Sequence, residues 1–180
     1  MRSVLAVGAH PGDIETGCGA TLAAHRAAGD AVTMLVLAGP EPAAEAAARA
    51  LDCLLVRARI TGDVVRADAA TIAAIENVVT GVAADVIYVH AADDSDADRR
   101  AAAAATLSAV RHGSRVLHYP GPSTLTFAPS VFVDVSAHLD RKLAVLDDPE
   151  VAAASARYFG ALARVRYAEA FAPTRFVWDL

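Results

Sequence analysis

The chain has few of the features that would cross-link it or attach it to a membrane. It contains only two cysteines, Cys18 and Cys53, and their separation fits no metal-binding motif. No apolar run reaches the ~18 residues that a membrane-spanning helix needs. The short apolar run at the N-terminus is not followed by a cleavage site, so it is interpreted as a strand and not as a signal peptide. These absences predict a cytoplasmic protein with reduced thiols and no membrane partner.

Positive charge and aromatic side chains are also scarce. The 16 Lys and Arg residues are outnumbered by 21 Asp and Glu residues, which gives a net charge of −5. Because phosphate binding needs a basic surface, this balance argues against nucleic acid as a partner. Aromatic residues make up 6% of the chain and apolar residues 55%, with alanine prominent among them. The composition predicts closely packed helices with small side chains, in one domain that spans residues 1–180.

Short apolar runs of strand length alternate with longer helical segments. The sequence predicts strands at residues 2–8, 31–37, 56–60, 85–90, 115–118 and 131–135, and helices at 16–28, 42–55, 68–82, 97–111, 136–146 and 150–169. The strand segments are continuously apolar, as in strands that are covered on both faces. The order predicts a single α/β domain, Rossmann-like, with a mostly parallel sheet and helices on both faces.

Polar side chains follow two of these predicted strands. His10 to Asp13 come after the first strand, and His90 to Asp98 surround the end of the strand at 85–90. Ligands of parallel α/β sheets bind beyond the carboxyl ends of the strands, so these two groups are expected to meet at one crevice. The loop at residues 120–129 is long for a compact domain, and its Ser123 and Thr124 are candidate ligand contacts together with His90.

The N-terminal segment AHPGDIETGCGA carries the most specific motif. It resembles the signature of the LmbE/PIG-L family of zinc-dependent N-acetyl (amino sugar) deacetylases, which reads His-Pro-Asp-Asp and then Gly-Gly. The segment at 93–101, DDSDADRRA, resembles the family's second signature, Asp-x-His-Pro-Asp-His-Arg-Ala. The segments ADVIYVH (84–90), FVDVS (132–136) and RYAEAF (166–171), and the loop at 119–127, are also similar to the family. The resemblance extends over nearly the whole chain and implies the family's α/β fold.

The resemblance also implies roles for particular positions, and three of them carry altered residues. His10 and Asp13 match two zinc ligands, whereas Arg99 stands where the family has its third ligand, a histidine. Gly12 replaces the aspartate that activates water, and Asp96 replaces the histidine that stabilises the oxyanion. An arginine stays protonated and offers no lone pair to a metal. Loss of a general base typically lowers the rate by about 10²–10⁴-fold and loss of an oxyanion donor by about 10²–10³-fold, so impaired catalysis is predicted.

Three functional hypotheses follow from these substitutions. The first is a non-hydrolytic small-molecule-binding or scaffold homologue without a cofactor, whose ligand resembles an amino sugar or a natural-product intermediate. The second is a hydrolase of a C–N amide bond with a rewired site, in which His10, Asp13 and either Asp96 or Asp98 hold zinc or another divalent metal. The third is a metal-free enzyme with Asp96 or Asp98 as acid or base and Arg99 as an anion clamp.

Several residues have a structural interpretation beside the functional one. The sequence His-Pro-Gly-Asp fits a type II turn, with proline and glycine at its central positions. His90 is interpreted equally well as a buried structural histidine, and the acidic run at 93–98 as a solvated helix start. The guanidinium of Arg99 is expected to bridge Asp13 and Asp96 in place of a metal. The alanine-rich helix at 42–55 is a candidate interface for a homo-oligomer.

Overall fold

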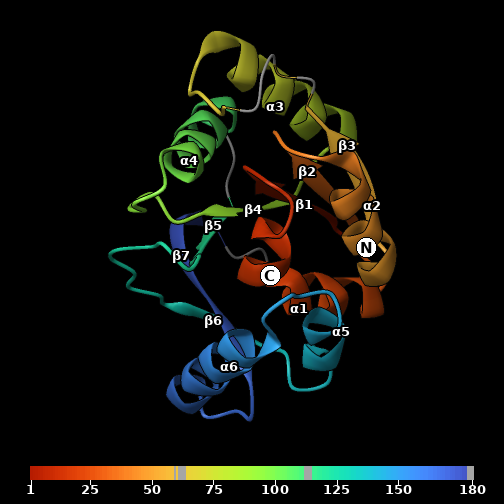
Figure 1. Cartoon of the computed structure of the whole chain (residues 1–180), viewed down its shortest axis with the longest axis vertical. Coiled ribbons are helices and arrows are strands. Elements are labelled where there is room, and N and C mark those ends of the chain that lie inside the picture. The colour runs from red at the N-terminus through yellow and green to blue at the C-terminus, as the bar shows by residue number, and fades with distance from the viewer. Residues whose placement is uncertain (59, 61–63, 112–114, 178–180) are drawn as a thin grey trace.

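In a computed structural model, the chain folds around one seven-stranded sheet (Figure 1). The structure describes residues 1–58, 60, 64–111 and 115–177. The strand order is β3-β2-β1-β4-β5-β7-β6, and the five strands from β3 to β5 are parallel. The last two strands run antiparallel to their neighbours. The strands are β1 (Ser3–Gly8), β2 (Ala31–Val36), β3 (Leu54–Arg57), β4 (Val86–His90), β5 (Arg115–Tyr119), β6 (Val131–Asp134) and β7 (Ala168–Phe176). The predicted α/β class and mostly parallel sheet are confirmed.

Helices cover both faces of the sheet because successive side chains of its strands are apolar on both faces. In β1, Val4 and Ala6 belong to one buried cluster, whereas Leu5 and Val7 belong to the other. The first cluster includes side chains of α1 (Asp13–Ala27) and α2 (Glu41–Leu51), and the second includes side chains of α3 (Ala69–Val82) and α4 (Ala97–Ala109). This two-sided packing explains why the strand sequences do not alternate between apolar and polar residues.

The C-terminal segment differs most from the prediction. A helix was expected over residues 150–169, but α6 spans Pro149–Ala163 and ends at Arg164, whose φ of 59° is left-handed. The chain then turns, and β7 begins at Ala168. Gly160 permits this close turn, because a Cβ there would lie 2.8 Å from the carbonyl oxygen of Arg166. The prediction was wrong because β7 pairs with both β5 and β6, and this part of the sheet takes up the apolar residues that the helical pattern had claimed.

Other element boundaries shift by a few residues. Helix α1 begins at Asp13 and not at residue 16, α2 ends at Leu51, and β3 therefore starts at Leu54. The predicted strand at 56–60 also included Arg59, which lies outside the described residues. The helix expected at 136–146 is shorter, since α5 spans Leu139–Leu143.

A buried ion pair ties α5 to β7 and α1. Lys142 Nζ lies 2.6 Å from Glu169 Oε1, and both side chains are almost fully buried. The Glu169 carboxylate also accepts hydrogen bonds from the backbone N–H groups of Ala20 and Thr21. These two N–H groups are free because α1 is interrupted at Cys18, whose backbone leaves the helical region. The pair therefore fixes the C-terminal strand against the broken first helix.

Within the described residues, no helix is both long enough and apolar enough to cross a membrane.

The pairing of β5 with β7 contains a buried histidine. His118 Nδ1 donates a hydrogen bond to the His90 carbonyl oxygen at 2.6 Å, and Nε2 lies 2.6 Å from the Thr174 hydroxyl oxygen. The first contact requires a proton on Nδ1, because a carbonyl oxygen can only accept, whereas the Thr174 hydroxyl can either donate or accept. Burial lowers the pKa of His118 from its usual value and outweighs the hydrogen bond to the His90 carbonyl oxygen, which acts to raise this pKa.

We predict that His118 makes the free energy of unfolding depend on pH. Because its pKa is lower in the folded protein, its contribution is complete above the unfolded pKa of about 6.5 and is lost as the pH falls. The His118→Gln variant cannot titrate, so it should lose less stability than wild type between about pH 7.5 and pH 5.5. Urea unfolding at both pH values measures this, and equal losses in the two proteins would contradict the assignment.

Candidate functional site

The motif His10-Pro11-Gly12-Asp13 forms the turn that connects β1 to α1. The Asp13 N–H donates to the His10 carbonyl oxygen at 3.3 Å, and Gly12 has φ 93° and ψ −24°. These angles are those of the third residue of a type II turn, so the turn interpretation is confirmed. The left-handed φ favours glycine at position 12. Asp13 is thereby placed at the carboxyl end of β1 and at the first residue of α1.

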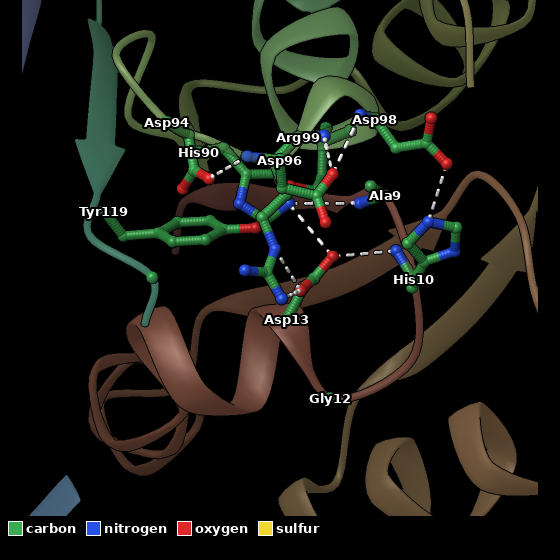
Figure 2. A network of polar contacts seen from close by, with 12 residues as sticks. Ala9, His10, Gly12, Asp13, His90, Asp94, Asp96, Asp98, Arg99 and Tyr119 are labelled. Atoms are coloured by element: carbon green, nitrogen blue, oxygen red, sulfur yellow. Dashed lines mark hydrogen bonds and ion pairs between the residues drawn. The ribbon is translucent and has the colours of Figure 1, made fainter. Parts of the chain in front are cut away.

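Arg99, from the first turn of α4, makes a two-point contact with Asp13. Its Nε and Nη2 lie 3.0 and 2.9 Å from the same oxygen, Asp13 Oδ1. The Asp13 side chain is 3% exposed and that of Arg99 18%. Figure 2 shows the guanidinium reaching from α4 to the carboxylate at the start of α1. The predicted contact between Arg99 and Asp13 is confirmed.

The second oxygen of Asp13 is also engaged. Its Oδ2 accepts from the His10 backbone N–H at 2.8 Å and lies 3.2 Å from His90 Nε2. Burial acts to raise the pKa of Asp13, but the contact with His90, the His10 N–H and the charge of Arg99 together bring it below its usual value. Asp13 is therefore a carboxylate in the folded protein.

The His10 imidazole points away from Asp13. Its Nε2 lies 2.9 Å from Asp98 Oδ2, and the ring extends toward Asp98 while the Asp13 carboxylate turns toward Arg99 (Figure 2). The two residues that match zinc ligands in the resemblance thus do not converge on one point. Each of them is paired with a different residue of α4.

The expected bridge from Arg99 to Asp96 is not what the structure shows. Asp96 is the N-cap of α4, where its Oδ1 accepts from the backbone N–H groups of Asp98 and Arg99. The second partner of the guanidinium is instead Ser123, whose Oγ accepts from Arg99 Nη1. The reason is local, because aspartate is a favoured N-cap residue and satisfies helix N–H groups that would otherwise have no partner.

The hydrogen bonds of Asp94 were not predicted from the sequence. Its side chain accepts hydrogen bonds from the hydroxyls of Ser123, at 2.6 Å, and Thr124, at 3.1 Å. Burial acts to raise the pKa of Asp94, but these two bonds and the Asp96 N–H hold it below its usual value. Ser123 and Thr124, predicted to contact a ligand, thus hold the loop after β5 against Asp94. Their spacing from Asp94 in the sequence gave no sign of this contact.

His90 lies behind Asp13 and does not line an open crevice. Its side chain is 1% exposed, and the Ala9 N–H donates to its Nε2 at 3.1 Å. The ring packs beside Tyr119, with the ring centroids 4.8 Å apart, and Nδ1 has no hydrogen-bond partner among the described residues. Of the two interpretations of His90, burial supports the structural one, because the side chain positions Asp13 and does not reach solvent.

These residues do not fit a zinc ion. A hydrolytic zinc site needs three protein ligands and an open position, whereas Asp13 binds a guanidinium and His10 binds Asp98. In the described part of the chain, no group of three or more His, Cys, Asp or Glu side chains is arranged to hold a metal. A fixed cation at Arg99 also repels a second cation at the same carboxylate.

A cavity of about 450 Å³ opens beside this network. Gly12, Thr16 and Gly121 form its wall next to Asp13 and Arg99, and α5, α6 and the start of β7 form the rest. A Cβ on Gly121 would lie 3.8 Å from Arg99 Nη1, so the cavity and the network share a wall. Its volume is in the range of small-molecule sites.

Comparison with known proteins gives structural matches only, since no family model and no curated protein matches the chain. The conserved protein TT1542 from Thermus thermophilus is 25% identical, with a TM-score of 0.88 over 100% of this chain and 98% of that one. GalB, the 4-carboxy-2-hydroxymuconate hydratase from Pseudomonas putida, is 20% identical, with a TM-score of 0.83 over 100% of both chains. The N,N'-diacetylchitobiose deacetylase from Pyrococcus horikoshii is 17% identical, with a TM-score of 0.81 over 96% of this chain and 84% of that one.

The chain shares their fold. Deacetylases are among the proteins of this fold, as the resemblance of the N-terminal motif implied, and a hydratase is another. Because proteins of one fold carry out different reactions, the fold does not assign a reaction to this chain. The reaction has to be judged from the residues around Asp13.

We predict that Arg99→Ala destabilises the protein by about 3 kcal/mol, because removing one partner leaves a buried carboxylate unpaired. Arg111→Ala, which removes an exposed arginine that lies 3.5 Å from Glu76, should change stability by less than about 0.5 kcal/mol. Chemical denaturation of the three proteins at neutral pH tests the comparison. If Arg99→Ala unfolds at the same denaturant concentration as wild type, the pair with Asp13 does not support the fold.

Proposed function

We propose that this protein is a non-hydrolytic, small-molecule-binding relative of the LmbE/PIG-L deacetylases, with Arg99 in the place of a metal. The observation that carries the proposal is the pair of N–H groups that Arg99 directs at one oxygen of Asp13. A guanidinium there supplies the positive charge that a metal would supply, but it has no open coordination position for a water molecule.

The other positions around Asp13 also lack hydrolytic chemistry. Gly12 has no side chain, and its left-handed φ of 93° makes any other residue strained there. Asp96 caps α4, so its carboxylate is directed at backbone N–H groups. A carboxylate would in any case repel a developing oxyanion, where catalysis needs a hydrogen-bond donor. Gly12 thus supplies no general base, and Asp96 supplies no oxyanion donor, for the hydrolysis of an amide.

Binding of a small molecule is supported by the cavity beside Gly12. It lies next to the contact between Asp13 and Arg99, and its volume of about 450 Å³ suits a small organic ligand. Chitobiose deacetylase and GalB, which share the fold, are named for reactions of small molecules. The proposed ligand is likewise a small molecule, of a sugar-like or natural-product-like kind.

Metal content tests this function. Untagged wild-type protein, dialysed against micromolar Zn²⁺ and then against metal-free buffer, should hold far less than one zinc per chain by mass spectrometry. The Arg99→His variant should hold more zinc than wild type, because it removes the competing cation and adds an imidazole donor.

Two results would overturn the proposed function. One is about one zinc per wild-type chain that is lost in His10→Ala, since this would require Arg99 to leave Asp13. The other is release of acetate from an N-acetyl amino sugar by wild type, at a rate abolished by Asp13→Asn. An amide substrate left intact by both proteins agrees with the proposal.

A further inference from the structure

A second cavity, of about 350 Å³, lies at the end of the sheet opposite Asp13. Its lining includes Arg2, which precedes β1, and Val86 and Arg115, the first residues of β4 and β5. These residues mark the amino ends of the parallel strands, whereas Asp13 follows the carboxyl end of β1. No described residue lines both this cavity and the one beside Gly12, and its volume is in the range of small-molecule sites.

One side of α1 forms a wall of this second cavity. Thr21, Ala24 and His25 line it at the spacing i, i+3 and i+4, so their side chains share one side of the helix. Thr21 is 0% exposed, and its Oγ1 has no hydrogen-bond partner among the described residues. Because a buried hydroxyl without a partner is unfavourable, a ligand atom that hydrogen-bonds to Thr21 removes a cost that the free protein carries.

The neighbouring polar groups of this wall are already paired. His25 Nδ1 lies 2.8 Å from Asp30 Oδ2, and His25 Nε2 lies 2.9 Å from the Tyr88 hydroxyl oxygen. Burial acts to raise the pKa of Asp30, but the hydrogen bonds from the Arg2 N–H and from His25 bring it below its usual value. Of the described residues that line the second cavity, Thr21 is the one whose buried polar atom lacks a partner.

The two arginines that line the second cavity do not favour an anion at Thr21. Arg2 is exposed, and an ion pair with an exposed side chain contributes little. Arg115 is already engaged, since its Nε donates to the Val177 carbonyl oxygen at 2.9 Å. An anion that moves to the buried Thr21 hydroxyl loses far more hydration free energy than a neutral hydroxyl does. The buried part of the wall therefore favours an uncharged ligand.

The sheet side of the second cavity is apolar and partly aromatic. Val86 contributes from β4, Leu117 from β5, and Val131, Phe132 and Val133 from β6. Phe132 is partly buried and forms no ring pair within the described part of the chain. Because pairs of aromatic rings are more favourable than their buried area alone accounts for, an aromatic ligand gains most from this wall.

We infer that this second cavity binds an uncharged aromatic molecule that carries a hydroxyl group, such as a phenol. The ligand hydroxyl pairs with the Thr21 hydroxyl, and the ring is covered by Leu117 and Phe132. The inference goes beyond the proposed function, because it concerns the other end of the strands and does not depend on whether Asp13 holds a metal.

Calorimetric titration with 2-naphthol at neutral pH, where its hydroxyl is protonated, tests this inference. Wild type should bind the compound saturably. Thr21→Val keeps the shape of the side chain but removes the hydroxyl, so it should weaken binding about fivefold. Its urea midpoint should be unchanged or higher, because the lost hydroxyl had no partner. Thr106→Val is the matched control and should bind as wild type does, since it removes an equally buried and unpartnered hydroxyl of α4 that does not line this cavity.

A second pair of variants locates the bound compound. Ala24→Leu extends a side chain into the second cavity and should weaken binding at least about tenfold, whereas Ala27→Leu, at an exposed position of α1 that does not line it, should not. The inference is overturned if wild type shows no saturable binding, if either matched pair of variants binds equally well, or if 2-naphthoate binds as tightly as 2-naphthol. None of these outcomes changes the zinc content that tests the proposed function.

Discussion

Asp13 is a carboxylate with almost no contact with water, and a charge at that depth must be compensated by the protein around it. Its compensation comes from three separate parts of the chain. Arg99 approaches from the start of α4, His90 from the end of β4, and the His10 N–H from the turn after β1. One buried charge therefore joins the carboxyl ends of two neighbouring strands to the helix that covers them.

The first turn of α4 places the side chains that contact Asp13 and His10. The Asp96 side chain caps the helix through the N–H groups of Asp98 and Arg99, which fixes the direction of the first turn. From that turn Asp98 reaches His10, while Arg99 reaches Asp13 and the loop hydroxyl of Ser123. The side chains of the first turn of α4 thus hold His10 and Asp13 in separate contacts. The cavity beside Gly12 remains open next to these contacts.

Much of the fold could be predicted from the sequence, because continuously apolar strands and intervening helices specify a parallel sheet covered on both faces. Helix α6 and β7 could not be separated in advance, since their apolar residues fit a long helix until the place of β7 between β5 and β6 is known. At the site, the contact of Arg99 with Asp13 was predicted from the resemblance, which puts Arg99 at the position of a metal ligand. The acidic run at 93–98 was interpreted as a helix start, and Asp96 caps α4 there. The burial of Asp94 under the loop hydroxyls could not be predicted, because it depends on side-chain directions that spacing alone does not set.

The proposal that a guanidinium takes the place of a metal at Asp13 is tested most directly by anomalous X-ray diffraction at the zinc edge. Crystals grown with zinc at neutral pH would be measured on both sides of the edge. The account predicts no anomalous peak between His10 and Asp13, and Arg99 nitrogens within hydrogen-bond distance of Asp13 Oδ1. A peak bonded to both His10 and Asp13, with Arg99 turned away from them, would contradict it.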